Sequence, residues 1–352
     1  MFLFAFKTGR FEIGDKVLNY ICRNDNIKTK SSTCPVCGQR TELTKSNIYW
    51  CETCKVPLYQ KECQCCGSSG RRLTTDIRPV FPEERLLLEI MTDKTPGYYE
   101  KMSVWNCSGN RYIADGQRVD FAVKDLKNKN PNDIRIRYEN EVSNIDYRYF
   151  NEFKDRFIKA NRSRYEFIVK EAVDYIKNST KDYTAKDMFV SFSGGKDSTV
   201  TSDLVMRALS EPKILHIFGD TTLEFPETMK YIERFKKEHP QTPVVSSRNK
   251  DKDFEELCAL VGPPSRVMRW CCTIFKTGAI QRKIKTMFRN KNKIITFYGI
   301  RRNESASRNK YERETEGSKI TKQITISPII DWMDFDVWLY MLTTEIDFNY
   351  AY

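Results

Sequence analysis

A glycine-rich segment, Ser191-Phe-Ser-Gly-Gly-Lys-Asp-Ser198, is the sequence feature that most restricts how this chain can fold. It follows the apolar residues 188–190 and precedes a helix-like run over residues 199–209. A strand, a glycine turn and a helix in this order aim backbone N–H groups and a helix N-terminus at an anion. The two glycines permit positive φ and a close backbone approach, and the lysine adds a charge. The segment therefore predicts a site for phosphate, pyrophosphate or sulfate.

The residues around this loop predict an α/β fold. Strand-like runs at 188–192, 213–218, 243–246 and 293–298 alternate with helix-like runs at 198–209, 227–237, 254–261 and 273–288. Such alternation is typical of a doubly wound, mainly parallel sheet. Ligands bind at the carboxyl ends of the strands in these sheets, and both the loop and Asp220-Thr221 follow a strand-like run.

The rest of the chain changes in composition along its length. We expect a cysteine-rich zinc-ribbon region over residues 1–70, a small β-rich module over 71–125, a linker with amphipathic helices over 126–185, and the nucleotide-binding domain over 186–352. Short β-like runs such as 87–90 suggest the second part, and the polar residues 126–143 suggest the linker. The apolar start at 1–7 is interpreted as a strand rather than a signal peptide. We find no repeat of the α/β unit.

Cysteine usage and hydropathy indicate the compartment. The twelve cysteines gather in C-x-x-C pairs instead of forming a scattered disulfide framework. This pattern predicts metal binding in a reducing cytoplasm. No apolar run is long enough to span a membrane, so we expect no membrane partner.

The positive charge is concentrated in one stretch. Residues 276–322 contain fourteen Lys and Arg against four Glu, which accounts for +10 of the net charge of +12. Such a stretch attracts a polyanionic nucleotide, a nucleic acid, or both. The alternative for about half of these residues is an ordinary solvated helix face.

Three cysteine knuckles precede residue 70. Cys34-Pro-Val-Cys37 and Cys51-Glu-Thr-Cys54 are separated by thirteen residues, and Cys63-Gln-Cys-Cys66 follows eight residues later. This spacing is typical of a zinc ribbon, in which four thiolates hold a structural Zn²⁺. The first and third knuckles compete for the second, and the sequence leaves the pairing open. Cys22 and Cys65 are candidates to complete a second site. Such a ribbon either stabilises its module or docks a nucleic acid or protein.

The loop resembles the pyrophosphate-binding loop (PP-loop) of the ATP pyrophosphatases and the phosphoadenylyl-sulfate (PAPS) reductases, and it lacks the Walker A spacing. Four further segments resemble motifs of the PAPS reductase family and its adenylyl-sulfate (APS) reductase branch in the same order. They are Phe218-Gly-Asp-Thr-Thr-Leu-Glu-Phe-Pro-Glu-Thr228, Arg269-Trp-Cys-Cys-Thr-Ile-Phe-Lys276, Gly299-Ile-Arg-Arg-Asn-Glu-Ser-Ala-Ser-Arg308 and Ser327-Pro-Ile-Ile-Asp-Trp-Met-Asp-Phe-Asp-Val-Trp338. The resemblance covers about residues 186–340.

This resemblance implies an adenine nucleotide (ATP, APS or PAPS) and names the residues that would hold it. The nucleotide-binding candidates are Ser191, Ser193, Gly194, Gly195, Lys196, Asp197, Ser198, Asp220, Thr221 and Gly299. The catalytic candidates are Lys196, Asp197, Lys276, Arg301 and Arg308. Arginines suit phosphate and sulfate because they donate charge-assisted, bidentate hydrogen bonds. Asp220, a carboxylate at a strand end, is a candidate to position a ribose, a water or Mg²⁺.

The adjacent pair Cys271-Cys272 resembles half of an iron–sulfur motif. In the APS reductase branch, two adjacent cysteines and a downstream C-x-x-C hold a [4Fe–4S] cluster. No cysteine follows Cys272 in this sequence, so the downstream pair and the C-terminal cysteine with which reductases attack the sulfonucleotide are both missing. Three interpretations stay open: a truncated chain, a cluster completed from elsewhere, or a pair of inert buried thiols.

Together these features predict a PAPS reductase-family enzyme of sulfur transfer that acts on APS, PAPS or ATP with a sulfur donor or redox partner protein. The missing cysteine argues against a self-contained reductase. The alternative is an ATP pyrophosphatase that adenylates tRNA or DNA for thiolation or phosphorothioation, which the zinc ribbon and the basic stretch favour. A non-catalytic nucleic-acid or partner-binding protein is the third hypothesis, which the loop, Arg301 and Arg308 disfavour.

Overall fold

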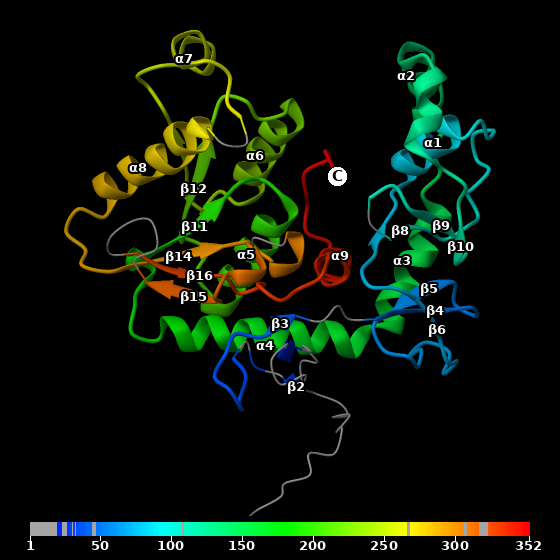
Figure 1. Cartoon of the computed structure of the whole chain (residues 1–352), viewed down its shortest axis with the longest axis horizontal. Helices are drawn as coiled ribbons and strands as arrows, with labels where there is room; N and C mark the ends of the chain where they lie inside the picture. Colours follow the sequence, from blue (N-terminus) through cyan, green and yellow to red (C-terminus); the bar gives the residue numbers. More distant parts are fainter. Residues whose placement is uncertain are drawn as a thin grey trace, which may run out of the picture. The chain divides into compact units, whose positions relative to one another are not determined.

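The computed structural model describes residues 20–22, 27–29, 31, 33–43, 47–107, 109–265, 268–305, 308–316 and 323–352. The chain forms two compact units, each described here by itself (Figure 1). The first contains Met1–Ile168 and Asp334–Leu339, and the second contains Val169–Met333 and Tyr340–Tyr352. In the described part of the chain, none of the helices combines the length and the apolar character needed to cross a membrane.

A six-stranded sheet forms the centre of the second unit. Its strands are β11 (Met188–Phe192), β12 (Leu215–Asp220), β13 (Val244–Arg248), β14 (Ile294–Tyr298), β15 (Glu314–Glu316) and β16 (Gln323–Ile326), in the order β13-β12-β11-β14-β16-β15. All neighbours pair in parallel except β15 and β16, which are antiparallel. The predicted doubly wound, mainly parallel sheet is confirmed. The strand order reverses between β11 and β14, which is where such sheets bind ligands.

Helices connect these strands close to the positions expected. They are α5 (Lys196–Leu209), α6 (Pro226–Glu238), α7 (Phe254–Val261), the π-helical segment η4 (Cys272–Gly278) and α8 (Ala279–Met287). A last helix, α9 (Asp334–Thr344), follows β16, and its residues are divided between the two units. Pro226 begins α6 because its fixed φ suits the first helical position. The Asp253 side chain accepts the Glu256 N–H and thereby caps α7. Short 3₁₀ helices are η3 (Ala185–Asp187), η5 (Arg302–Glu304) and η6 (Arg308–Lys310).

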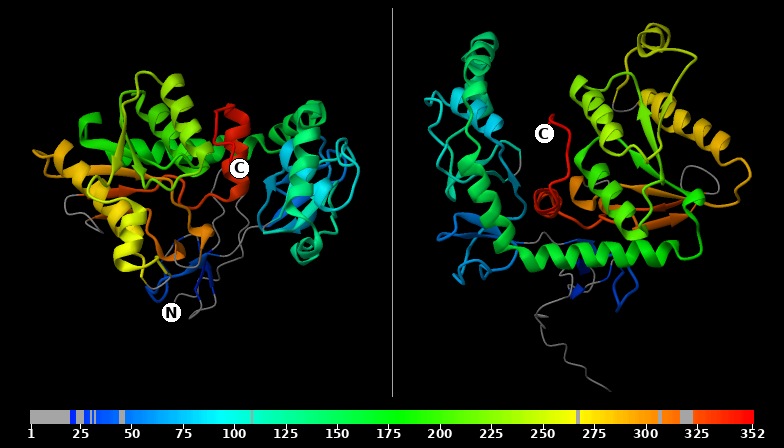
Figure 2. Two further views of the ribbon diagram at one scale, coloured as in Figure 1. Left: turned by 90° about the horizontal axis from the view of Figure 1, so that it is seen from above. Right: turned by 180° about the vertical axis from the view of Figure 1, so that it is seen from behind.

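Side chains along each strand alternate between the two faces of the parallel sheet, and helices bury both faces. On one face Phe189 and Ile217 pack against α8. On the other face Phe192 and Phe218 pack against α6. Figure 2 shows α8 and α6 on opposite sides of the sheet. Each fully buried side chain of this kind stabilises the fold by about 1.5–3 kcal/mol.

The first unit is built from small antiparallel sheets and helices. Its described strands are β1 (Tyr20–Cys22), β2 (Ile27–Thr29) and β3 (Glu42–Leu43); β4 (Ile48–Cys51), β5 (Val56–Leu58) and β6 (Arg71–Thr74); and β7 (Arg78–Pro79), β8 (Val104–Asn106), β9 (Tyr112–Ala114) and β10 (Gln117–Arg118). Its helices are α1 (Pro82–Met91), η1 (Val123–Asn128), α2 (Pro131–Glu141), η2 (Val142–Asn144) and α3 (Arg148–Ala160), and α4 (Arg162–Thr180) begins in it.

Two local expectations for this unit are wrong. Residues 87–90, expected as a β-like run, belong to α1, because Pro82 and two acids in the first turn favour a helix start. The polar residues 126–143, expected as a linker, contain α2, which begins at a proline and is capped by the Asn130 side chain. The strand expected at 1–7 lies outside the described residues.

A tight turn joins β9 to β10 and fixes a tryptophan in the core. Asp115 and Gly116 have φ of 47° and 78°, as a two-residue hairpin turn requires. A Cβ on Gly116 would lie 2.4 Å from Nε1 of Trp50, which is fully buried. Glycine is therefore needed at this position both for its conformation and for the space that the indole occupies.

His216 is a buried titratable group in the second unit. Its Nε2 lies 2.7 Å from the Ser202 hydroxyl and its Nδ1 lies 2.9 Å from the Ile214 carbonyl oxygen. Burial disfavours the charged imidazolium and lowers the pKa of His216 to about 4.

This burial predicts a loss of stability in mild acid. Between about pH 6.5 and pH 4 the unfolded chain binds a proton at His216 that the folded chain does not, so stability rises with pH in this window. Lowering the pH from 7 to 4.5 should cost wild type roughly 2–3 kcal/mol more than His216→Gln. Urea unfolding at the two pH values measures this difference. Equal losses in the two proteins would contradict the assignment.

Candidate functional site

The glycine-rich loop connects β11 to α5 beside the point where the strand order reverses. Gly194 has a φ of 71°, and a Cβ there would lie 3.2 Å from side-chain atoms of both Ile232 and Thr228. Gly195 is the N-cap of α5, and no side chain caps the helix there. The first N–H groups of α5 are therefore directed outward, as an anion site requires.

The loop serines are bonded to each other. The Ser198 hydroxyl donates to the Gly195 carbonyl oxygen at 2.8 Å and accepts the Ser193 N–H at 3.2 Å. The two serine hydroxyls lie 3.1 Å apart. Ser191 precedes them within β11, between Ile217 and Tyr298 in the sheet register. In this geometry the serines fix the shape of the loop.

Gly299 brings the end of β14 against the first turn of α5. A Cβ at this position would lie 2.5 Å from both the carbonyl carbon and the carbonyl oxygen of Asp197, and 2.7 Å from the Ser198 nitrogen. These are backbone atoms, which cannot move without moving the loop. Only glycine permits this approach.

Arg301 holds Asp197 with a bidentate ion pair. Its Nε and Nη2 donate to the two carboxylate oxygens at 2.9 and 3.3 Å. Arg301 is only 3% exposed, so the pair is strongly shielded from water. Lys196 Nζ lies 4.0 Å from the same carboxylate. The sequence analysis assigned Arg301 to the bound anion, whereas this geometry joins it to the loop itself.

Two residues near the loop have no counterpart in the sequence analysis. The Asn349 side-chain amide donates to the Gly194 carbonyl oxygen at 3.2 Å and to the Thr228 hydroxyl at 2.8 Å. The Tyr352 ring centroid lies 4.9 Å from Lys196 Nζ, within range of a cation–π interaction. No local motif signals these contacts, because they join positions about 150 residues apart.

Asp220, Thr221 and Lys276 lie around the neighbouring strand end. Asp220 ends β12 and accepts the Thr222 N–H at 2.9 Å, while Thr221 donates its N–H and hydroxyl to Glu224. The Lys276 Cγ would lie 3.8 Å from a Cβ placed on Gly219. The π-helical segment thus brings Lys276 beside the carboxyl end of β12.

Arg308 is placed differently. It forms an ion pair with Glu304, and its side chain is 40% exposed. Glu304 also accepts the Arg301 N–H at 3.4 Å. A second arginine that the sequence analysis did not single out, Arg302, is buried and paired with Asp331. Of the arginines in the Gly299–Arg308 motif, Arg301 is therefore the one that the structure joins to the loop.

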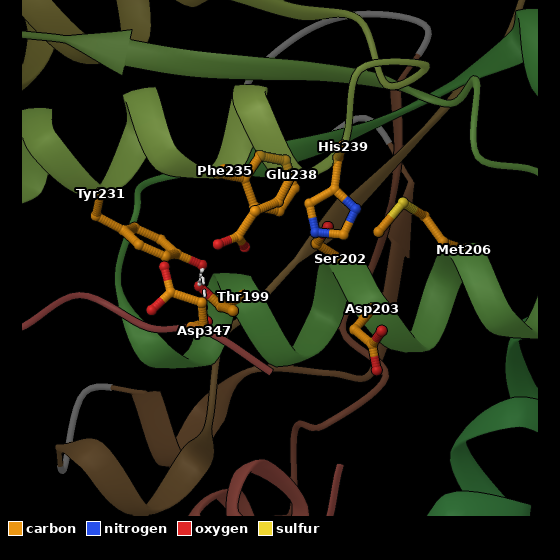
Figure 3. Close-up of a pocket in the computed structure, with 9 residues that line it drawn as sticks. All are labelled: Thr199, Ser202, Asp203, Met206, Tyr231, Phe235, Glu238, His239 and Asp347. Carbon is orange, nitrogen blue, oxygen red and sulfur yellow. Dashed lines mark hydrogen bonds between the residues drawn. The ribbon is translucent and has the colours of Figure 1, made fainter. Parts of the chain in front are cut away.

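A small pocket on the side of α5 that faces α6 does not suit an anion. Figure 3 shows its lining, which includes Tyr231, whose hydroxyl lies 2.8 Å from that of Thr199. Three carboxylates, those of Asp203, Glu238 and Asp347, also line it. Arg207 and Arg234 pair with Asp203 and Asp347, and the carboxylate of Glu238 makes the pocket less suited to a phosphate than the helix N-terminus at the loop.

In the first unit, the structure settles which knuckles pair. The sulfur atoms of Cys51, Cys54, Cys63 and Cys66 all lie within 4.8 Å of one another. Two pairs of these sulfurs are 3.5 and 3.7 Å apart, close to the roughly 3.8 Å separation in a tetrahedron with Zn–S bonds of about 2.3 Å. Burial raises the pKa of the Cys51 and Cys54 thiols, so a bound cation is needed to keep all four as thiolates. This donor set fits zinc.

The first knuckle belongs to a separate cluster. Cys34 and Cys37 lie with Cys22, and the Cys22 and Cys37 sulfurs are 3.6 Å apart. Cys65 is exposed and belongs to neither cluster, and Cys107 is buried. Among the described residues, the pair Cys271-Cys272 also belongs to neither, and Cys272 lies beside the Arg269 guanidinium.

Comparisons with known proteins find similar sequences for part of this chain. Residues 187–352 match the model of the phosphoadenosine phosphosulfate reductase domain. This part of the chain belongs to that family. The match begins just before β11 and contains the loop, Gly299 and Arg301.

Relatives of known sequence extend the similarity. Two uncharacterized proteins of Methanocaldococcus jannaschii are 32% identical over 235 and 237 residues, which is 67% of this chain. The chain spans about half the length of these relatives, 45% and 54%. The adenosine 5'-phosphosulfate reductase of Anoxybacillus flavithermus is 28% identical over 48% of this chain and 68% of its own. Among solved structures, the PAPS reductase of Candida auris is 14% identical, with a TM-score of 0.38 over 51% of this chain and 88% of its own.

The close approach at Gly299 yields a test of the loop. Gly299→Ala should displace the first turn of α5 and weaken nucleotide binding at least tenfold while leaving the protein folded, because the added Cβ meets backbone atoms. Gly219→Ala is the matched control, since its Cβ would meet only side-chain atoms at 3.4 Å or more. Equilibrium binding of ATP, APS and PAPS together with circular dichroism measures both effects. An affinity in Gly299→Ala equal to that of wild type would contradict this account of the site.

Proposed function

We propose that this chain is an adenine-nucleotide enzyme of sulfur metabolism that uses APS, PAPS or ATP in a sulfur-transfer reaction. The observation that carries the proposal is the glycine-rich loop at the switch point of the sheet, with Gly299 packed against its helix. The family match of residues 187–352 supports the same conclusion.

In this proposal the loop binds the phosphates of the nucleotide. The N–H groups at the start of α5 and the ammonium of Lys196 would neutralise the phosphate charge. Arg301 would act as a positioning residue, because it fixes Asp197 and with it the first turn of the helix. A well-placed donor aimed at the developing charge contributes about 3 kcal/mol to transition-state stabilisation.

The residues at the end of β12 would contact the part of the nucleotide that reacts. We propose that Lys276 provides a positive charge there and that Asp220 and Thr221 position the ribose, a water or Mg²⁺. Carboxylate and water oxygens are the ligands that Mg²⁺ prefers. Arg308, seven residues after Arg301 and at the start of η6, would reach the outer part of the anion from its exposed position.

A second candidate function is an ATP pyrophosphatase acting on tRNA or DNA. In that reaction a substrate oxygen attacks the α-phosphorus of ATP. The bond between that phosphorus and the oxygen that bridges it to the β-phosphate breaks, and pyrophosphate leaves. The cysteine clusters of the first unit and the basic stretch over residues 276–322 favour a nucleic-acid substrate. A sulfur donor or redox partner protein is needed in either case.

One pair of assays separates the two candidates. Anaerobically purified protein is incubated with ATP and assayed for pyrophosphate, with and without bulk tRNA or DNA, and in parallel its binding of APS and PAPS is measured. Tight APS or PAPS binding without ATP turnover would support the first candidate. Pyrophosphate release that requires nucleic acid would support the second, and neither activity would exclude both.

Lys196 provides the sharpest test of the nucleotide site. Lys196→Ala should reduce nucleotide affinity or turnover by about a hundredfold, because a partly buried point charge on the phosphates is lost. Lys213→Ala is the matched control, since Lys213 is exposed and precedes Leu215, where β12 begins, at the end of the strand away from Asp220. Full activity in Lys196→Ala would overturn the assignment of the loop.

We further propose that Cys51, Cys54, Cys63 and Cys66 hold a structural zinc ion. Cys54→Ser should lose this zinc and destabilise the first unit by several kcal/mol, because metal binding to such a site contributes directly to folding. Zinc analysis and thermal unfolding measure both effects. Unchanged zinc content and melting temperature would refute the proposal. For Cys271-Cys272 the [4Fe–4S] proposal stands on the family motif alone, and iron and sulfide analysis of anaerobic protein tests it.

A further inference from the structure

The two cysteine clusters lie in two copies of the same small fold. In the first copy β1 pairs with β2 so that Tyr20 faces Thr29 and Cys22 faces Ile27. In the second copy β4 pairs with β5 so that Tyr49 faces Leu58 and Cys51 faces Val56. Each of these positions is shifted by 29 residues from its counterpart, as from Tyr20 to Tyr49.

The third strand and the knuckle follow the same shift. Tyr20 faces Leu43 in β3, and Tyr49 faces Arg72 in β6. The isolated bridge between Thr33 and Arg40 corresponds to the one between Glu62 and Ser69.

The tight knuckle turns also correspond. The Cys34 N–H donates to the Gln39 carbonyl oxygen at 2.7 Å, and the Cys63 N–H donates to that of Ser68 at 3.0 Å. The glycine that follows each knuckle has a positive φ, 71° at Gly38 and 74° at Gly67. The chain therefore contains a tandem repeat of a three-stranded ribbon, which the sequence analysis did not find.

The repeat aligns the cysteines one by one. Cys22, Cys34 and Cys37 correspond to Cys51, Cys63 and Cys66, so the three thiols of the first ribbon occupy three of the four ligand positions of the second. The remaining position, that of Cys54, corresponds in the sequence to Asp25, which lies outside the described residues. Residues 1–50 contain no histidine and no further cysteine. The first ribbon thus provides three sulfur ligands and neither a fourth sulfur nor an imidazole.

We propose that the first ribbon is a second zinc site, held by the thiolates of Cys22, Cys34 and Cys37 and by one oxygen ligand. Cys22 and Cys34 are only 1% and 2% exposed, and the Cys22 and Cys37 sulfurs are 3.6 Å apart, which is a separation that a shared Zn²⁺ allows. Carboxylate and water oxygens are the ligand class that zinc accepts beside sulfur and nitrogen.

The two sites differ in the strength of their ligands. Four thiolates give the second site a net charge of −2, and three thiolates give the first site −1 with a neutral oxygen and −2 with a carboxylate. The oxygen ligand is harder than a thiolate and binds zinc less strongly than sulfur does. The first site therefore releases its zinc to a competing chelator sooner than the second.

Zinc content of the full-length protein tests the proposal. Wild type and the matched control Cys65→Ser, which alters an exposed cysteine outside both clusters, should each contain two zinc ions per chain. Cys22→Ser and Cys51→Ser should each contain one. One zinc in wild type, two in Cys22→Ser, or iron in place of the second zinc would overturn the proposal.

A cobalt experiment guards against misfolding of the variants. When Co²⁺ replaces zinc, the thiolate-to-cobalt absorption should fall in Cys22→Ser to about four sevenths of its wild-type intensity, because four of seven thiolate ligands remain on the metal. Loss of the whole absorption would show that the first ribbon is not an independent site. Chelator challenge of the zinc protein should release one equivalent fast and one slowly, with the fast phase absent in Cys22→Ser. Release of both zinc equivalents at one rate would contradict the proposal that the first site has an oxygen ligand.

Discussion

The packing of the β14 end against the first turn of α5 is the contact on which the rest of the candidate site depends. Gly299 leaves no space for a side chain above the Asp197 backbone, and two residues later Arg301 closes the same contact with a shielded ion pair. The loop is thus held between neighbouring parallel strands. Without this contact the outward N–H groups of α5 would have no fixed direction, and an anion would gain little from them.

The first unit relies on a different kind of constraint. Its sheets have two to four residues in each strand, which is too short to bury a core comparable to that of the second unit. A metal ion held by each cysteine cluster, as proposed above, would compensate, because it would join two knuckles by bonds that do not depend on buried area. The buried Trp50 beneath Gly116 adds the apolar packing that one ribbon shares with the neighbouring hairpin.

Much of the second unit could be predicted from sequence, and the reason is physical. The central strands β11 and β14 are apolar runs buried on both faces, and α5, α6 and α7 have a proline or an acid in the first turn, so the strands β11 to β14 fall close to where they are expected. The pairing of the knuckles could not be predicted, because C-x-x-C spacing is the same for every partner. Asn349 could not be found either, since its contact with Gly194 depends on the folded path of the chain. The tandem ribbon was detectable in principle. Asp25 stands in the first ribbon at the position that Cys54 has in the second, however, so the two cysteine motifs do not look alike in the sequence.

The internal bonding of the loop has a consequence for selectivity. The hydroxyls of Ser193 and Ser198 bond to each other and to the loop backbone, and Arg301 bonds to Asp197. What the loop offers to a ligand is therefore main-chain N–H and the charge of Lys196, which suit the phosphate groups that every nucleotide carries. Such groups do not distinguish a phosphate–sulfate anhydride from a triphosphate. In the proposed function that distinction falls to the neighbouring strand end, where Lys276 lies beside Gly219, so a change there would alter the reaction while the loop stays the same.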